Sequence, residues 1–200
     1  MTDLFKDKAD DFDSNDIPRQ LSMGIGSSML QNVELHDGME VMDFGAGTGL
    51  ITAHVTDKVG KITAVDVSEA MLEKLASKEE LKGKVEIICQ DILEKPLDRK
   101  FDLIVSAMAM HHVKDTDQLL ARFSEHLKPG ARVALADLDT EDGDFHPEDV
   151  EGVYHSGFDR EELMEKMQSN GFRNIRFTTA YTLEKDTKTY PIFLALADKG

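Results

Sequence analysis

The sequence predicts an α/β protein built on an open, doubly wound sheet that is mostly parallel. Across the middle of the chain, short apolar runs alternate with segments of helical periodicity. Most of these runs are continuously apolar, which is typical of strands buried on both faces. Strand and helix in alternation imply right-handed crossovers, with helices on both faces of the sheet. The last two apolar runs have no room for a helix between them, so a C-terminal antiparallel hairpin is expected.

Seven strands follow from this pattern. Five are expected to begin at Glu40, Lys61, Lys84, Phe101 and Ala131, and the hairpin pairs "FRNIRFTTAYTL" with "TYPIFLALAD". The helices have recognisable ends. Ser68 and Asp159 are expected N-caps, and Pro129-Gly130 follows the helix "TDQLLARFSEHL". A further helix over residues 17–33 is expected to cap the carboxyl edge of the sheet, although Gly24 and Gly26 weaken it.

Composition narrows the class of protein. Two hundred residues suit one domain. The net charge of −16 and the scattered basic residues argue against a nucleic-acid substrate, because phosphate binding needs a basic surface. Cys89 is the only cysteine, expected in a buried strand, so no internal disulfide can form. The acidic N-terminus lacks the apolar core of a signal peptide, and no apolar run could span a membrane. These features predict a cytoplasmic protein.

The segment "VMDFGAGTGLIT" places three glycines directly after the first strand, where open parallel sheets bind ligands. A dinucleotide-binding loop has the pattern G-x-G-x-x-G/A, but counting from Gly45 its last position is Leu50. Asp43, inside the strand, would repel a pyrophosphate and is costly without a partner. It suits a cationic ligand, or the N–H groups of the loop.

Two later acidic residues fit a nucleoside. Asp66 ends the second strand, where a carboxylate can accept both ribose hydroxyls. Asp91 follows the third strand and could face an adenine amino group, with Ile92 stacked on the ring. A nucleoside with a positively charged tail therefore satisfies all these positions.

Five segments, "VMDFGAGTGLIT", "ITAVDVSEAMLEKL", "IICQDI", "FDLIVSAMAMHHV" and "LKPGARVALAD", resemble the successive motifs of class I S-adenosylmethionine-dependent methyltransferases. The resemblance covers residues 40–138 and is strongest to the small "type 11" group. It implies a Rossmann-like, seven-stranded sheet, S-adenosylmethionine as cofactor and S-adenosylhomocysteine as product. It also implies cofactor contacts from Asp43, Gly45, Ala46 and Gly47 to the methionine part, Asp66, Val67 and Met71 to the ribose, Asp91 and Ile92 to the adenine, and Ser106 and Ala107 near the sulfonium.

With this resemblance, the single domain 1–200 divides into N-terminal cap helices (1–39), a cofactor-binding core (40–138), an acceptor-pocket loop (139–158), and a helix with the terminal hairpin (159–200). We expect the acceptor pocket to include Phe12, His146, Tyr154 and His155. Phe12 and the N-terminal segment would close over the cofactor.

Three histidines are candidates for proton abstraction, which suits imidazole near neutral pH. His111 and His112 follow the fourth strand, and His155 lies just before the Asp159 cap. Each has a structural alternative, in which the ring only fixes a loop by a hydrogen bond to a carbonyl. No metal site is expected, because the spacing of His146, Glu148, Asp149 and His155 fits no zinc pattern and thiolate ligands are lacking.

The function expected is methyl transfer from S-adenosylmethionine to a small molecule through oxygen, nitrogen or sulfur. A protein methyltransferase and a non-catalytic S-adenosylmethionine-binding regulator stay open as alternatives. A dinucleotide-dependent oxidoreductase is opposed by Leu50, Asp43 and the terminal hairpin. The oligomeric state is not predicted by the sequence.

Overall fold

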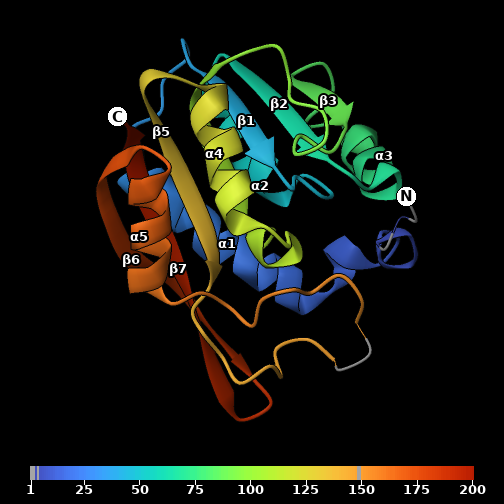
Figure 1. Cartoon of the computed structure of the whole chain (residues 1–200). Coiled ribbons are helices and arrows are strands. Elements are labelled where there is room, and N and C mark those ends of the chain that lie inside the picture. The colour runs from blue at the N-terminus through green and yellow to red at the C-terminus, as the bar shows by residue number, and fades with distance from the viewer. Residues whose placement is uncertain (1–2, 4, 148–149) are drawn as a thin grey trace.

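A computed structural model describes residues 3, 5–147 and 150–200 of the chain. Seven strands form one sheet in the order β3-β2-β1-β4-β5-β7-β6 (Figure 1). Their bounds are β1 Glu40–Phe44, β2 Lys61–Asp66, β3 Val85–Cys89, β4 Phe101–Ala107, β5 Leu127–Leu138, β6 Phe172–Lys185 and β7 Lys188–Lys199. Strands β1 to β5 are parallel, whereas β7 runs antiparallel to both β5 and β6. The predicted doubly wound sheet with its C-terminal hairpin is confirmed.

Helices cover both faces of this sheet. The helices are α1 Asp16–Asn32, α2 Leu50–Val55, α3 Glu69–Ser77, α4 Thr116–His126 and α5 Arg160–Ser169, with short 3-10 turns η1 Lys6–Lys8, η2 Phe12–Ser14, η3 Thr56–Lys58 and η4 Met110–His112. Helices α4 and α5 lie on one face, and α1 and α2 lie on the other (Figure 1). The predicted N-caps are confirmed, since the side chains of Ser68 and Asp159 accept from N–H groups of the first turns of α3 and α5.

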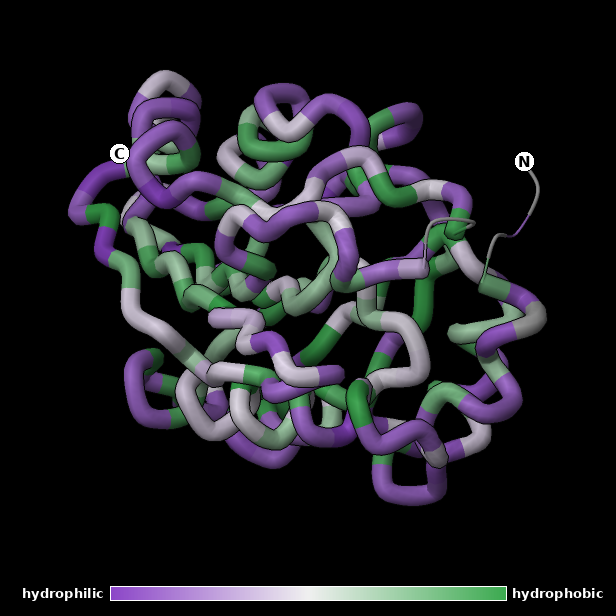
Figure 2. Tube along the Cα trace, turned by 90° about the horizontal axis from the view of Figure 1, so that it is seen from below, coloured by the Kyte–Doolittle hydropathy of each residue, from purple (hydrophilic) through white to green (hydrophobic). Residues whose placement is uncertain are grey.

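The hydrophobic core has a layer on each face of the sheet, and each strand contributes side chains to both layers. Successive side chains of a strand point to opposite faces. In β5, Val133 and Leu135 therefore pack on the α4 side, and Ala134 and Ala136 on the α1 side. Along the chain trace, hydrophobic residues concentrate in the interior and hydrophilic residues in the outer turns (Figure 2). No helix among the described residues combines the length and apolar character needed to cross a membrane.

Helix α1 differs from its predicted position. It packs on a face of the sheet, beside α2 and against β6 and β7, and only its N-terminal half reaches the carboxyl edge. The two glycines explain why it lies so close. A Cβ atom on Gly24 would come within 2.3 Å of the Tyr181 ring, and one on Gly26 within 2.4 Å of the His54 ring. These glycines cost helix propensity but permit close packing.

Two details at the sheet edges correct the sequence-based expectations. Cys89 is exposed, not buried, because it ends β3, an edge strand with a neighbour on one side only. The terminal hairpin is longer than predicted, since pairing continues to Lys185 and Lys188. Asp186 and Thr187 form its two-residue turn, both with positive φ.

Candidate active site

A cavity of about 1470 Å³ lies at the carboxyl ends of β1, β2 and β4. The start of α1, turn η4, Asp3, Phe5, Lys8 and Phe12 of the N-terminal segment, and residues 145–147, 151–152 and 154–155 of the loop that follows β5 complete its wall. The base of that loop is pinned to the sheet. Asp139 and Phe158 form a parallel bridge, and a Cβ atom on Gly157 would lie only 2.1 Å from the Asp139 carbonyl oxygen. Gly157, with a φ of 75°, is thus required for this close approach.

The glycine loop, residues 45–49, forms one end of the cavity. Gly45, Gly47 and Gly49 all have positive φ, and the N–H groups of Gly45 and Ala46 donate to the Val65 carbonyl at 2.9 and 3.1 Å. A Cβ atom on Gly45 would come within 2.3 Å of Ala109, whereas one on Gly47 would meet nothing within 4 Å. Gly45 therefore permits close packing against Ala109. The space beside Gly47 is unoccupied by other atoms of the chain.

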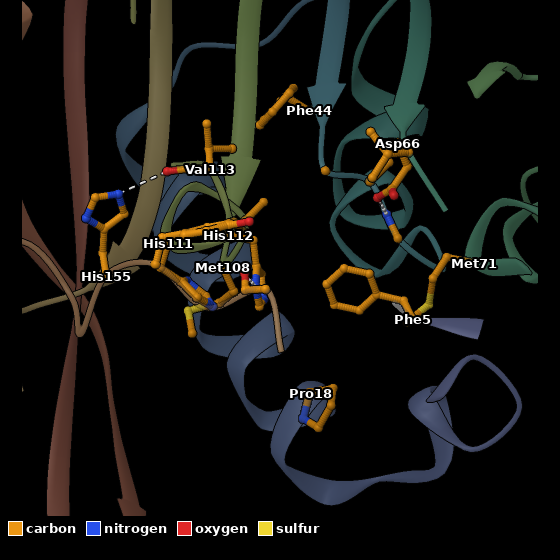
Figure 3. Close-up of a pocket in the computed structure, with 18 of the residues that line it drawn as sticks. Phe5, Pro18, Phe44, Asp66, Met71, Met108, His111, His112, Val113 and His155 are labelled. Carbon is orange, nitrogen blue, oxygen red and sulfur yellow. Dashed lines mark hydrogen bonds between the residues drawn. The ribbon is translucent and has the colours of Figure 1, made fainter. Parts of the chain in front are cut away.

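Asp66 fixes this loop at the end of β2. Its two carboxylate oxygens accept hydrogen bonds from the backbone N–H groups of Gly47 and Ser68, each at 2.8 Å. Burial raises the pKa of Asp66, while these N–H donors act in the opposite direction. In Figure 3, Asp66 lies at the cavity wall, near Met71. The carboxylate that suits a ribose thus also orders the glycine loop.

Asp43 is almost fully buried beneath the loop. The Thr52 hydroxyl donates to its carboxylate at 2.5 Å. Burial, with a smaller contribution from the negative charge of Asp66, raises the pKa of Asp43 to about 7, although the Thr52 bond opposes the shift. A cation bound beside Asp43 would favour its ionised form.

The N-terminal residues lie across the cavity and are held at the start of α3. The Asp3 carboxylate accepts from the Ser68 hydroxyl at 2.9 Å and from the Ala70 N–H at 3.3 Å. Phe5 consequently lies between Met71 and His112 (Figure 3), with its ring centroid 5.1 Å from that of the His112 ring. Phe12 also lines the cavity. The sequence pointed to Phe12 but gave no periodic signal for Phe5.

At the opposite end, a buried carboxylate holds turn η4. Asp137, at the end of β5, accepts from the N–H groups of Met110 and His111 at 2.9 and 3.2 Å, and from Nδ1 of His111 at 2.7 Å. Burial alone would raise the pKa of Asp137, but attraction to His111 and these hydrogen bonds outweigh it and lower the pKa. Asp137 was not among the residues selected from the sequence, where its only signal is an acidic residue near the end of a buried apolar run.

His111, His112 and His146 form a histidine cluster. Nδ1 of His112 donates to the Gly152 carbonyl at 2.8 Å, and Nε2 of His146 lies 3.1 Å from Nε2 of His111. Burial, together with repulsion from the neighbouring His111, lowers the pKa of His112 to about 4 and that of His146 to about 3. His112 and His146 are therefore neutral at pH 7.

His155 is outside this cluster. Its Nε2 donates to the Val113 carbonyl at 2.9 Å, and Figure 3 shows the ring directed toward Val113, away from His111 and His112. This is the structural alternative considered for His155. Tyr154 is half-exposed at the cavity wall, where its N–H donates to the His111 carbonyl at 2.9 Å.

The cavity brings together most of the residues selected from the sequence. Its wall includes Asp43, Gly45, Ala46, Gly47, Asp66, Val67, Met71, Asp91, Ala107, Phe12, His111, His112, His146, Tyr154 and His155. Ile92 and Ser106 are not part of this wall, since both side chains are fully buried, and their contacts with the cofactor stay a prediction. Ile92 packs in the core on the α4 side, so Leu93 is the apolar side chain at that point of the wall. Glu148 and Asp149, considered as metal ligands, lie outside the described residues.

Comparisons of sequence place the chain among methyltransferases. A family described as a methyltransferase domain matches residues 41–130. An uncharacterized methyltransferase of Geobacillus sp. is 30% identical over 162 residues, which cover 78% of this chain and 75% of the relative. An uncharacterized methyltransferase of Schizosaccharomyces pombe is 32% identical over 165 residues, covering 74% of this chain and 56% of the relative. The chain thus spans little more than half the length of the yeast relative.

Solved structures share the fold. A chain of the complex between the Haloferax volcanii Trm112 methyltransferase activator and a methyltransferase superposes with a TM-score of 0.82 at 18% identity, over 99% of this chain and 98% of that one. Haemonchus contortus phosphoethanolamine N-methyltransferase 2, in complex with S-adenosylmethionine, superposes with a TM-score of 0.73 at 18% identity, over 98% of this chain and 60% of that one. At this identity the likeness concerns the fold alone.

Proposed function

This chain belongs to the class I S-adenosylmethionine-dependent methyltransferases, and on that basis we propose that it methylates a small molecule at oxygen, nitrogen or sulfur. The observation that carries the proposal is a single cavity that joins the glycine loop and Asp66 at one end to the histidine cluster at the other. The first end suits the cofactor, and the second end suits an acceptor.

The cofactor end offers a partner for each part of S-adenosylmethionine. Asp43 would attract the positive charge of the methionine part, and Gly47 leaves open space for it. Asp66 is the candidate acceptor for the ribose hydroxyls. Asp91 and Leu93 at the end of β3 are the candidates for the adenine edge and face.

The size of the cavity supports a second, small ligand. Pockets for one drug-sized ligand occupy roughly 300–1,000 Å³. A volume of about 1470 Å³ therefore exceeds the space needed for the cofactor alone. Phe5, His146 and Tyr154 line the acceptor end from distant parts of the chain, which favours a small molecule over an extended polymer. The acidic character of the chain, with a net charge of −16, also argues against a nucleic-acid acceptor.

Methyl transfer from a sulfonium is an in-line displacement in which a positive charge disappears. Holding the acceptor behind the methyl carbon can contribute about 7–11 kcal/mol to the lowering of the barrier. Hydroxyl and thiol acceptors must also lose a proton. The histidine cluster, which contains neutral imidazoles and is supported by Asp137, stands at the acceptor end to assist that loss.

The test is transfer of an isotopically labelled methyl group to a panel of small phenols, amines and thiols, with a mixture of unfolded proteins as a second panel. We expect label in at least one small molecule, loss of transfer in His112→Ala, and unchanged transfer in His36→Ala, whose ring is exposed outside the cavity. Label in the proteins alone would contradict the small-molecule assignment. Cofactor binding without any transfer would favour the non-catalytic regulator.

A further inference from the structure

Three imidazoles converge at the acceptor end of the cavity. One ring nitrogen from each of His111, His112 and His146 lies within 4.8 Å of the other two. Among the described residues, no other group of three or more His, Cys, Asp or Glu side chains brings its ligand atoms together in this way. A single base would need only one such nitrogen, so the convergence calls for a separate explanation.

The outer contacts of two of these rings leave their inner nitrogens available. Nδ1 of His111 donates to the Asp137 carboxylate at 2.7 Å, and Nδ1 of His112 donates to the Gly152 carbonyl at 2.8 Å. In the neutral form of each ring, Nδ1 therefore carries the proton and Nε2 presents a lone pair. Metal-binding histidines characteristically donate their second N–H to a carboxylate or a backbone carbonyl, which fixes the tautomer and ring orientation.

We propose that His111, His112 and His146 form a three-imidazole site for a divalent first-row transition metal ion, with an open coordination position toward the cavity. Three protein ligands and one open position are the arrangement of catalytic zinc sites. Zinc–nitrogen bonds of 2.0–2.1 Å in a tetrahedron place the nitrogens about 3.3 Å apart. The Nε2 atoms of His111 and His146 are already 3.1 Å apart. The distances from these two rings to the ligating nitrogen of His112 are at most 4.8 Å, so they shorten by up to about 1.5 Å when the ion binds.

Two nearby charges act on such an ion in opposite directions. The buried carboxylate of Asp137 favours a cation in the cluster through His111. The ammonium group of Lys8 opposes one, as it also opposes protonation of His112 and His146. Lys8 is exposed, so solvent screens its effect. Asp137 has the larger effect of the two at His112, whereas Lys8 has the larger effect at His146.

The sequence-based expectation of no metal rested on a different set of residues, His146, Glu148, Asp149 and His155. The structure separates His155 from His146 and joins His146 to the adjacent pair His111 and His112. Two neighbouring histidines from a 3-10 turn and a third from a loop 34 residues later form no spacing pattern that a motif search recognises.

The role of the ion at the open position rests on the proposed function. A hydroxyl or thiol acceptor bound to the metal would lose its proton to solvent more readily, since a bound metal lowers the pKa of its ligands. The resulting anion would form the bond to the methyl carbon as the carbon–sulfur bond breaks and its electron pair returns to sulfur. This leaves neutral S-adenosylhomocysteine.

The test is calorimetric titration of the 200-residue chain, without a histidine tag, with Zn²⁺ in the absence of cofactor. We expect one Zn²⁺ per chain, at least tenfold weaker binding in His146→Ala and in His112→Ala, and unchanged binding in His36→Ala. Lys8→Ala should bind up to a few-fold more tightly. Circular dichroism of each variant checks that it is folded. Co²⁺ absorption gives a second signal, since tetrahedral nitrogen ligation has its own visible spectrum.

No saturable Zn²⁺ binding, or binding that survives both His146→Ala and His112→Ala, would overturn the metal site and leave the cluster as a proton relay between imidazoles. The measurement is independent of methyl transfer. A cofactor titration in the presence of a chelator tests the proposed function separately, so the two can fail independently.

Discussion

The two ends of the cavity are built in different ways. At the cofactor end, the side chains come from short segments at the carboxyl ends of β1, β2 and β3, and each segment is a motif in itself. At the acceptor end, Phe5, the histidine cluster and the loop 139–158 come from distant parts of the chain and meet only in the folded protein. A cofactor site can therefore be recognised from short sequence motifs, while the site beside it depends on tertiary contacts between distant parts of the chain.

The largest expected effect is on the acceptor end. Asp137→Ala would remove a buried carboxylate that binds two backbone N–H groups and the His111 ring. Breaking a buried, hydrogen-bonded pair costs about 3–5 kcal/mol. We expect the free energy of unfolding in urea to fall by that amount. Asp117→Ala, which breaks a surface pair with Lys166, is the control and should cost less than about 1 kcal/mol. Equal losses in the two variants would refute the central role of Asp137.

The corresponding change at the cofactor end is Asp66→Ala. It removes the acceptor for the Gly47 and Ser68 N–H groups and the proposed acceptor for the ribose. Hydrogen bonds to charged groups are worth about 1.5–3 kcal/mol. We expect S-adenosylmethionine to bind on the order of a hundredfold more weakly by calorimetry, whereas Asp57→Ala, at an exposed pair with Lys84, leaves the affinity unchanged. Unaltered affinity in Asp66→Ala would disprove the ribose assignment.

Asp43 gives an effect that depends on pH. Its pKa of about 7 in the folded protein lies above the ordinary value of 3.8, so the folded state holds a proton that the unfolded state releases between these values. The contribution of Asp43 to stability is therefore present at low pH and is lost as the pH rises through about 7. Asp43→Asn should then be more stable than the wild-type chain at pH 8, by up to about 4 kcal/mol.

Cofactor binding should show the opposite trend at Asp43. A cationic ligand prefers the ionised carboxylate. Below pH 7, affinity for S-adenosylmethionine should therefore increase as the pH increases, by up to about tenfold per pH unit. Asp43→Asn should bind more weakly and should lack this slope. Thermal unfolding and calorimetry at pH 6 and pH 8 measure both quantities. A slope retained in Asp43→Asn would show that another group is responsible.

The same contrast explains how far the sequence could predict the structure. The strands themselves, the terminal hairpin and the caps at Ser68 and Asp159 follow from periodicity and capping, which are local. Asp43, Gly47 and Asp66 could be placed because each stands at a fixed offset from a strand end. Ile92 and Ser106 lie outside the cavity wall, because which side of a strand end faces the cavity depends on the neighbouring layers.

The acceptor end could not be assembled from the sequence. His111 and His112 were visible as a pair, but their contact with His146 depends on the path of the loop 139–158. Phe5 reaches the cavity only because Asp3 is held at the start of α3. Asp137 looked like one more residue of a buried strand. The division of the chain into four functional segments stays a prediction, as does the cytoplasmic location.

The central claim is that the glycine loop and Asp66 hold S-adenosylmethionine. Parallel calorimetric titrations of the wild-type chain with S-adenosylmethionine, S-adenosylhomocysteine and NAD test it most directly. We expect saturable binding of the first two at one molecule per chain and no binding of NAD. Binding of NAD, or no binding of any of the three, would contradict this assignment of the cavity.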